Sequence, residues 1–556
     1  MTKADIPGFS DKFTWALRLH KAGVLDEATV AYLEILDQTP LNPEASFLLG
    51  TIQLQQGHTD QACLHLAVAA CGLNPAEEAQ AAFSSAYEAL TIEMRLITVL
   101  KFSALLVSKR ASELSAPVIR ILRTLGESDN ALSLADRMLE AAPGTGELLR
   151  LRGQLLLDAG RVEDALTDFE SAFHILPEDC ELLTVYSASL ARTGRAEEAL
   201  GFAEQAAAAS LHLDNPDARR AALVQLLSCF IELQRLQDAC QAMLEFCKTA
   251  PNFPETWTVL ARCLYFSGRH EEAEATAGEG TMRFPNHIEL EWLHCVYAMA
   301  PVYRSIEAMQ ERRKSYASRL SALAERVASA DKHTRLRARL LSQDLTTYLL
   351  PYQYGEDDRK LQEIYGGMLV DLSEYKSLPK PVNRRSDNRI TIAFVSAFVW
   401  RHTNWRMKRG WLKYIDRNRF YLICIHLGER RDEMTAEIEG YCDAFHYLPS
   451  DYDGAVRALR EIQPEVVFYP EVGMSGAAQR LAADRLAPVQ CCAIGHPVTT
   501  GLATIDYFIS GELIEPEDAE AHYSERLIKL PGISFPYLPA PLPAEGLPRS
   551  YFGLSD

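Results

Sequence analysis

Two histidines in the C-terminal third of the sequence stand in segments that could carry proton-transfer chemistry. His402 lies in HTNWRMKRGW and His496 lies in GHPVTTG. Imidazole is the usual side chain for moving a proton near neutral pH, so each histidine is a candidate to orient or deprotonate an attacking nucleophile. The alternative for each is a loop histidine that only hydrogen-bonds the backbone.

Small and hydroxyl-bearing residues accompany both histidines and a third segment, EVGM. Hydroxyls can bind sugar or phosphate oxygens, and glycine lets the backbone approach a ligand closely. The threonines of GHPVTTG could equally cap a helix N-terminus. The candidate substrate-side residues are Thr403, Asn404, Gly473, Met474, His496, Pro497, Thr499, Thr500 and Gly501.

Two further groups of reactive side chains have structural explanations of equal or greater weight. Cys491 and Cys492 lie in an apolar run, which favours core packing over a nucleophilic role. The twelve cysteines include no CxxC pair, so we expect no disulfide framework, no zinc ribbon and no metal site. A diphosphate, or a solvated basic helix face, would explain the cations Arg401, Arg406, Lys408 and Arg409.

Short runs of β-branched and aromatic residues begin after Arg389. The elements that they form must position the three segments described above. The runs predict strands at ITIAFVS, FYLICIHLG, AFHYLP, EVVFYP, VQCCAIG, DYFISG and RLIKLP. Helical stretches between them, such as WRMKRGWLKYI and DGAVRALREI, imply a parallel sheet covered on both faces. In such sheets ligands bind at the carboxyl ends of the strands, where the three segments begin. We therefore expect a Rossmann-like α/β domain over 386–540 and a tail over 541–556.

A period of 34 residues organises the N-terminal half and resembles the tetratricopeptide repeat. Turn glycines, small helix residues and helix-ending prolines keep this spacing, as in Gly160 and Gly194, Ala165 and Ala199, or Pro143 and Pro177. The pattern predicts an α-helical solenoid of seven or eight repeats over 10–295, with a degenerate unit near 80–125 and an insertion between Ala199 and Ala239. Its concave face is expected to hold acceptor proteins or peptides, or else to space the chain or form a homo-oligomer.

A helical connector and linker are expected over 296–385, where the repeat phase is lost. Arg312, Arg313 and Lys314 predict a solvated helix face. Pro379 and Pro381 in SLPKPVNRRSDN predict a linker.

Composition narrows the function classes. Acidic residues outnumber basic ones by 75 to 56, a net charge of −19, which argues against general nucleic-acid or anionic-membrane binding. The N-terminus shows no signal-peptide pattern, and no apolar run reaches the roughly 18 residues of a membrane helix, so we expect a cytoplasmic protein.

The ordered motifs RLAPVQ, GHPVTTG, IDYFISG and HYSERL resemble the bacterial SPINDLY-type protein O-linked N-acetylglucosamine transferases, and cytosolic N-glycosyltransferases share GHPxTT. HTNWRMKRGW and YQYGEDDRKLQEIYG are similar to the family's upstream segments. The resemblance implies an inverting transferase of the two-Rossmann, GT-B type. Such an enzyme moves N-acetylglucosamine, or another hexose, from a UDP-sugar to Ser or Thr of proteins held by the repeats, without metal or other cofactor.

The resemblance also implies residue roles. His402 matches the catalytic histidine near the reacting centre, and His496, Thr499 and Thr500 match a loop on the acceptor side. Trp405 stands where small residues are common, so it could narrow or close the site. The sequence ends at LPRSYFGLSD, where relatives begin their second Rossmann domain. We thus expect UDP-sugar binding only if a donor-binding half is supplied; the alternative is a non-catalytic tetratricopeptide scaffold.

Overall fold

The computed structural model describes residues 9–72, 76–109, 111, 115–353, 356–377, 386–449, 451–537 and 547–555. The chain divides into two compact units, residues 1–251 and 252–556. Pro379 and Pro381 of the predicted linker lie outside the described residues, as do residues 541–546 at the start of the predicted tail.

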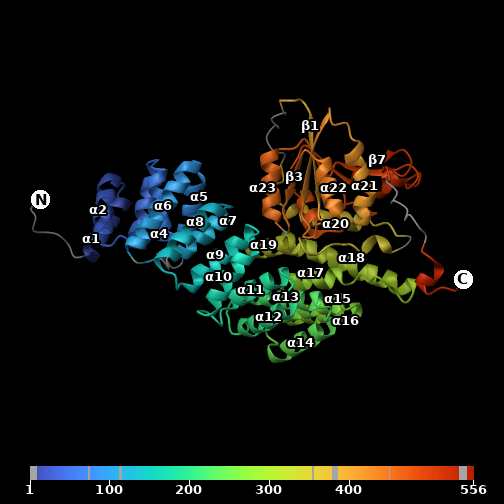
Figure 1. The fold of residues 1–556 in the computed structure, drawn as a ribbon, viewed down its shortest axis with the longest axis horizontal. Coiled ribbons are helices and arrows are strands. Elements are labelled where there is room, and N and C mark those ends of the chain that lie inside the picture. The colour runs from blue at the N-terminus through green and yellow to red at the C-terminus, as the bar shows by residue number, and fades with distance from the viewer. Residues whose placement is uncertain are drawn as a thin grey trace, which may run out of the picture. The chain divides into compact units, whose positions relative to one another are not determined.

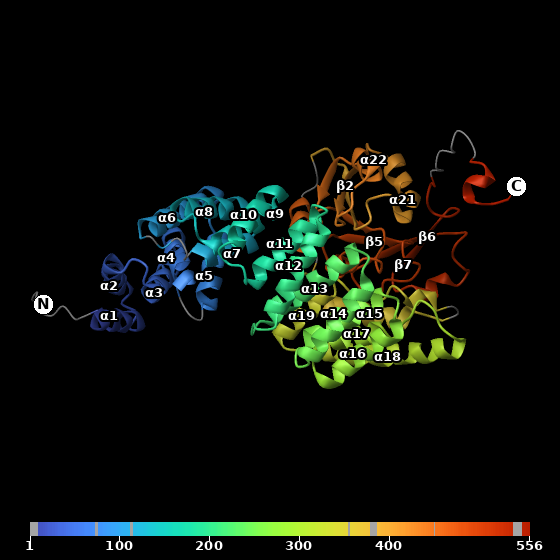
Figure 2. The same cartoon turned by 60° about the horizontal axis from the view of Figure 1, so that its bottom comes forward.

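The first unit is a stack of helices that pack mainly on their neighbours in sequence (Figure 1), which is the architecture of a solenoid. The same helices are seen from another side in Figure 2. A further pair, α15 (Pro254–Phe266) and α16 (His270–Arg283), opens the second unit. The predicted tetratricopeptide solenoid is confirmed. The helices of the first unit are α1 (Phe9–Lys21), α2 (Leu25–Gln38), α3 (Pro43–Gln55), α4 (Thr59–Gly72), α5 (Glu77–Glu88), α6 (Ile92–Ser108), α7 (Ala116–Thr124), α8 (Ser128–Ala141), α9 (Gly146–Asp158), α10 (Val162–Phe173), α11 (Cys180–Arg192), α12 (Ala196–Ser210), α13 (Pro216–Glu232) and α14 (Leu236–Thr249).

Small residues let paired helices approach, as the sequence pattern predicts. A Cβ atom on Gly153 of α9 would lie 2.4 Å from the ring of Phe169 on α10. Gly160, in the turn between these helices, has φ +76°, a left-handed conformation that favours glycine. The same conformation recurs at the corresponding turns, at Gly23, Gly57, Gly126, Gly194 and Gly268.

The irregular spacing between Ala199 and Ala239 has a simple structural origin. Helix α13 contains 17 residues, whereas α11 and α15 contain 13 each. The four extra residues are about one helical turn. The predicted insertion is therefore mostly a longer helix.

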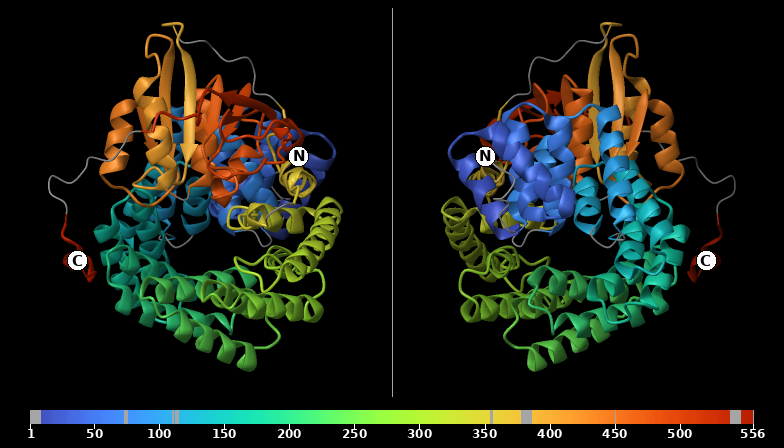
Figure 3. Two further views of the ribbon diagram at one scale, coloured as in Figure 1. Left: turned by 90° about the vertical axis from the view of Figure 1, so that its right-hand side faces the viewer. Right: turned by 90° about the vertical axis from the view of Figure 1, so that its left-hand side faces the viewer.

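The second unit contains a seven-stranded parallel sheet with the order β3-β2-β1-β4-β5-β6-β7, seen as orange to red strands in Figure 3. Each strand lies within one of the seven predicted runs, so the Rossmann-like domain is confirmed. The order reverses between β1 and β4, which marks the position where such sheets bind ligands. The strands are β1 (Ile390–Ser396), β2 (Phe420–His426), β3 (Ala444–Tyr447), β4 (Val466–Tyr469), β5 (Val489–Ala493), β6 (Tyr507–Gly511) and β7 (Arg526–Leu530).

Four helices connect the first five strands. Helices α21 (Thr403–Tyr414) and α22 (Glu433–Tyr441) pack together, as do α23 (Tyr452–Ile462) and α24 (Gly476–Ala482). Side chains from α21 and α22, among them Trp405, Leu412 and Ile438, form one core with strand residues. Removing this apolar surface from water is the main stabilising contribution of the layer.

The connector is helical and packs as part of the second unit. Helix α17 (Ile288–Val296) precedes it, and it contains α18 (Ile306–Ala328), α19 (Lys332–Leu341), a short 3-10 helix (Leu350–Tyr352) and α20 (Arg359–Asp371). A buried ion pair joins α24 to its neighbours: Arg480 and Asp484 are fully buried, and Asp484 also accepts hydrogen bonds from Tyr452 and from Ser373, which follows α20.

The prediction that three cations of α18 lie on a solvated face is wrong for two of them. Arg313 is buried and donates to Gln353 at 2.9 Å and to Asp358 at 2.7 Å. Arg312 donates to the Ala298 carbonyl at 2.8 Å and pairs with a glutamate of α16. Because α18 packs against α17 and α20, this face lies inside the unit and the cations satisfy buried acceptors.

The connector touches the GHPVTTG segment backbone to backbone. A Cβ atom on Gly501, whose φ is +68°, would lie 2.0 Å from the Gln362 carbonyl oxygen, and one on Gly366 would lie 2.3 Å from the Gly501 carbonyl oxygen. Glycine at both positions is what allows α20 to pack directly on this loop.

No helix among the described residues is long and apolar enough to cross a membrane.

We expect Gly501→Ala to destabilise the second unit by about 3 kcal/mol, because the new methyl group meets the α20 backbone in addition to the left-handed strain. Gly532→Ala is the matched control: its φ is +66°, but an added Cβ meets nothing within 4 Å. It should lose only about 1 kcal/mol. Urea unfolding monitored by circular dichroism measures both; equal losses would contradict the close-packing explanation.

Candidate functional site

The three predicted segments meet at the carboxyl ends of β1, β4 and β5, beside the switch point of the sheet. The first follows Ser396 at the end of β1, the second begins after β4 with Glu471, and the third follows β5 with Ile494. Neighbouring strands in this order bring the segments together, and a buried hydrogen-bonded chain then joins them.

This buried chain runs from Glu471 through Asn404 to Lys408. One Glu471 oxygen accepts the Ala397 N–H at 3.0 Å, and the other accepts the Asn404 amide at 2.8 Å. The Asn404 carbonyl oxygen accepts from the Lys408 ammonium group, which also reaches the Ile494 carbonyl at 3.4 Å. Glu471, Asn404 and Lys408 are at most 2% exposed. All three segments are thus held by one polar network inside the protein.

Burial has the largest effect on the pKa values of the two charged residues in this hydrogen-bonded series. It raises the pKa of Glu471 to about 7, against the opposing effects of hydrogen bonds and of the Lys408 charge. It lowers the pKa of Lys408 to about 8, against the attraction of Glu471. The mutual attraction of Glu471 and Lys408 opposes the effect of burial on both groups, and Asn404 lies between them as the hydrogen-bonded bridge.

Trp405 does not close the site. Its side chain is fully buried in the core beneath α21, and its indole N–H donates to the Ser396 hydroxyl at 2.9 Å. The expectation that this bulky residue narrows the site is wrong, because the helix turns it toward the sheet while His402 begins the same helix.

His402 is the N-cap residue of α21. Its Nδ1 accepts the Asn404 backbone N–H at 3.2 Å, and its ring stacks on Phe398 with centroids 4.6 Å apart. Burial, with a smaller effect of the Lys408 charge, lowers the pKa of His402. A neutral ring whose Nδ1 accepts carries its proton on Nε2, so His402 can offer an N–H to a ligand oxygen.

His496 has the opposite arrangement. Its Nε2 lies 3.0 Å from the Tyr348 carbonyl oxygen and donates to it, and burial lowers its pKa to about 4. The ring is 1% exposed, and Nδ1 has no hydrogen-bond partner among the described residues. A Cβ atom on Gly473, with φ +96°, would lie 2.5 Å from this nitrogen. Glycine at position 473 is therefore needed for the imidazole ring to lie here, because any side chain would clash with it.

The two threonines of GHPVTTG bind a carboxylate of the protein itself. The Thr499 hydroxyl donates to Glu525 at 2.6 Å, and the Thr500 N–H donates to Glu525 at 2.8 Å, with the Thr500 hydroxyl on the same oxygen. Both threonines are buried, and the segment continues through a turn into β6. The helix-cap alternative is therefore wrong.

The remaining predicted residues lie at the rim or in the wall of the site. Thr403 and Pro497 are exposed and Met474 is half-buried, whereas Gly501 packs on α20. Cys491 and Cys492 are buried in β5, and burial raises the pKa of the Cys491 thiol to about 12, which confirms core packing.

The basic residues of α21 do not form one cluster for a diphosphate. Arg401 pairs with Glu433 at 3.3 Å and Arg409 pairs with Glu437 at 2.6 Å. Lys408 is buried in the chain described above, and Arg406 is exposed.

Sequence reasoning named Lys408 only as a possible diphosphate contact and Glu471 only as part of the EVGM segment, and it missed their shared buried role. Two signals could have found them. Glu471 follows a buried strand next to the switch point, and Lys408 stands four residues after Asn404, on the same helix face.

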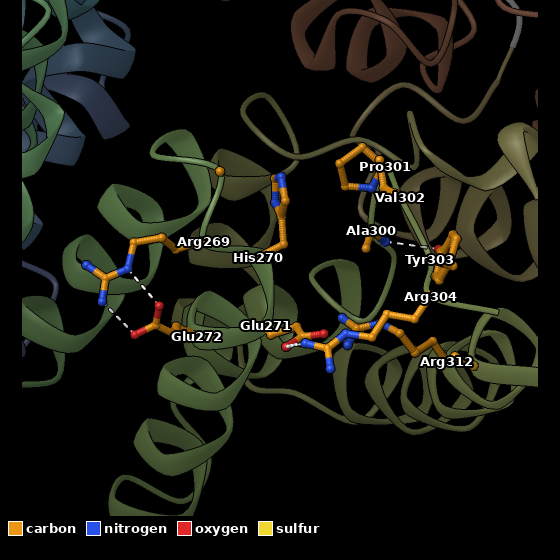
Figure 4. A pocket seen from close by; sticks show the side chains of 12 residues that line it. Arg269, His270, Glu271, Glu272, Ala300, Pro301, Val302, Tyr303, Arg304 and Arg312 are labelled. Atoms are coloured by element: carbon orange, nitrogen blue, oxygen red, sulfur yellow. Dashed lines mark hydrogen bonds and ion pairs between the residues drawn. The ribbon is translucent and has the colours of Figure 1, made fainter.

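A hollow of about 490 Å³ lies elsewhere in the second unit, between the start of α16 and residues 300–312 (Figure 4). Its charged side chains are matched internally, since Arg269 binds Glu272 at 2.6 Å and Arg304 binds Glu271 at 3.1 Å. This self-neutralised lining offers less to a charged ligand than the sheet edge does. The described residues include no group of three or more His, Cys, Asp or Glu side chains that could hold a metal ion.

Known proteins match parts of the chain. A tetratricopeptide repeat family model matches residues 119–179. The UDP-glucose:protein N-beta-glucosyltransferase of Actinobacillus pleuropneumoniae serotype 7 is 34% identical over 108 residues, 18% of this chain and 17% of that protein. The probable UDP-N-acetylglucosamine–peptide N-acetylglucosaminyltransferase SPINDLY of Eustoma exaltatum subsp. russellianum is 46% identical over 61 residues, 11% of this chain and 7% of that protein.

The matches thus span about a fifth or less of the length of these curated relatives. Among solved structures, an O-GlcNAc transferase of Thermobaculum terrenum covers 71% of this chain and 59% of its own, with 15% identity and a TM-score of 0.39.

We expect Lys408→Met to lower the free energy of unfolding by about 3 to 5 kcal/mol, because it leaves the Glu471 carboxylate buried without its cation. Glu471→Gln combined with Lys408→Met should lose clearly less than the sum of the single changes, with a coupling of about 2 kcal/mol. A double-mutant cycle in urea measures this. If the two losses simply add, Glu471 and Lys408 are not coupled through the hydrogen-bonded series.

His496 should make stability fall as the pH is lowered from about 6.5 to about 4, because the unfolded state binds a proton that the buried ring does not. The loss attributable to this residue is about 3 kcal/mol. Between these pH values the free energy of unfolding should change less for His496→Gln than for the native protein. His333→Gln, at an exposed position of α19 (Lys332–Leu341), is the control. If the free energy of unfolding of His496→Gln falls with pH as steeply as that of the native protein, His496 is not the cause of the pH dependence.

Proposed function

We propose that this chain, a relative of the SPINDLY-type O-linked N-acetylglucosamine transferases and of bacterial protein N-glucosyltransferases, provides the acceptor-side half of a protein glycosyltransferase. The observation that carries the proposal is the buried chain of Glu471, Asn404 and Lys408. It fixes the start of α21, where His402 is the N-cap, and reaches the Ile494 carbonyl just before the GHPVTTG segment, at the switch point where ligands of such sheets bind.

In this proposal the two histidines contact the acceptor group in opposite senses. His402 donates its Nε2 N–H to the acceptor oxygen, and the Nδ1 lone pair of His496 accepts the hydrogen bond of the acceptor hydroxyl or amide. The acceptor atom attacks the anomeric carbon of the sugar, the bond to the UDP oxygen breaks with inversion, and the proton lost by the acceptor passes to the departing UDP. Orientation of the nucleophile is the main contribution of this half, and rigid support of His402 serves it.

The donor is a UDP-sugar, with N-acetylglucosamine as the first candidate and glucose or another hexose as alternatives. The acceptors are Ser or Thr residues of proteins held by the repeats, in the cytoplasm, and the reaction uses no metal. The described residues supply the acceptor side of the site, and the proposal assigns the donor-binding wall to a second domain.

A second candidate, a non-catalytic scaffold that recruits proteins through its repeats, is favoured by one observation. The hydroxyls of Thr499 and Thr500 are already occupied by Glu525, so the loop does not present them to a sugar or phosphate.

Calorimetric titration with UDP, UDP-N-acetylglucosamine and UDP-glucose, followed by transfer assays, separates the two candidates. We expect no binding tighter than about 1 mM by the chain alone. We expect transfer to a protein acceptor when the chain is joined to the donor-binding half of the Actinobacillus relative. Micromolar binding by the chain alone would contradict the division into halves, and a folded chimera that binds donor without transferring sugar would favour the scaffold.

Variants of His402 test its role in that chimera. His402→Ala should lower kcat by about 100-fold, because an orienting hydrogen bond made in the transition state is lost. His402→Gln keeps an N–H donor and should retain more of the rate at constant donor affinity. Equal losses in both variants would indicate that a base, rather than a donor, is required.

A further inference from the structure

A small cavity of about 140 Å³ lies between the last tetratricopeptide pair and the connector, within the second unit. Its floor is apolar and buried, formed by Val296, Tyr297, Met299 and Leu345. An enclosed apolar cavity of similar volume, about 150 Å³, is known to accept a benzene ring. The space therefore has the size of one large apolar side chain.

The rim of this cavity is aromatic and accessible. Phe266 at the end of α15 is 53% exposed and Tyr348 in the connector is 41% exposed. Inside it, Tyr265 stacks on Tyr297 with centroids 4.4 Å apart and planes 7° apart. Such a lining favours a ring or a branched aliphatic group over a charged one.

One polar donor of the lining is available. Arg262 uses Nη2 to bind Glu289 at 3.1 Å, but its Nε atom is buried and has no hydrogen-bond partner among the described residues. A buried donor without an acceptor is unfavourable, so a ligand that supplies one gains affinity. A peptide carbonyl oxygen has the required chemistry.

Tyr348 is shared between this cavity and the candidate site. It lines the cavity, its ring stacks on His496 with centroids 5.4 Å apart, and its carbonyl oxygen accepts from His496 Nε2. Tyr352, 54% exposed, lies 6.4 Å from His496 between ring centroids. Tyr348 therefore contacts both the cavity and His496.

We propose that this cavity binds an aromatic or aliphatic side chain of the acceptor polypeptide, a few residues from the residue that is modified. The flanking backbone lies extended across Phe266 and Tyr348, and a backbone carbonyl accepts from Arg262 Nε. This inference rests on the proposed function, since it names the acceptor as the occupant. It gives the chain a sequence preference next to the modified position.

Fluorescence anisotropy with the full chain tests this subsite without any donor sugar. The probes are fluorescein-labelled Gly/Ser peptides of eleven residues with a central Ser, in which Phe, Leu or Ala is placed at each flanking position in turn. We expect one position at which Phe or Leu lowers the Kd about 10-fold or more relative to Ala.

Two variants locate the effect. Thr346→Trp, at a half-buried position of the lining, should fill the cavity and abolish the preference, and Phe266→Ala, at an exposed rim position, should weaken it without affecting folding. Leu336→Trp, at an exposed position of α19, is the matched control and should leave the preference unchanged. The absence of any preferred position, or the same preference in Thr346→Trp, would overturn the proposal.

The result is distinguishable from failure of the proposed function. A peptide preference that depends on the cavity, with no sugar transfer in the chimera, would retain the polypeptide subsite and reject glycosyl transfer. Sugar transfer that is indifferent to the flanking residue would retain the transferase and reject this subsite.

Discussion

The candidate site depends on one constraint, the burial of the Glu471 carboxylate at the switch point of the sheet. A carboxylate removed from water is costly unless its oxygens and charge are matched, and here one backbone N–H, one amide and one ammonium group provide the match. These partners come from the segments after β1 and from α21. Because they must all be present, the burial of Glu471 fixes the start of α21 and with it the position of His402.

Hydrogen bonds to the backbone determine which ring nitrogen of each candidate histidine is left without a partner among the described residues. The N–H of Asn404 occupies Nδ1 of His402, while the Tyr348 carbonyl occupies Nε2 of His496. One ring is left as a donor and the other as an acceptor, although both pKa values are lowered by burial. The two histidines thus differ in which ring nitrogen is hydrogen-bonded, because their backbone partners differ.

The sequence predicts elements better than it predicts burial. All seven strands and the turn glycines follow from local patterns, because alternation and left-handed turns are properties of neighbouring residues. The structural roles of Arg313 and Lys408 do not, since each depends on helices or loops far away in the chain. Trp405 shows the same limit: its residue type suggested a blocked site, but only the tertiary fold shows that the ring is in the core.

The contact between α20 and the loop at Gly501 bears on how such a chain can evolve. Repeats are gained and lost by duplication, and each repeat of a solenoid contacts only its neighbours. Helix α20, in contrast, meets the sheet domain through bare backbone at Gly366 and Gly501, and the Asp484 cluster ties Ser373 to the same domain. Recombination at a boundary between repeats leaves the contacts of α20 and Ser373 with the sheet domain intact. A crossover between α20 and β1 would instead combine an α20 and a sheet domain from different proteins, whose surfaces need not fit. The packing therefore favours inheritance of the connector together with the sheet, whereas the helices before it can change in number without disturbing these contacts.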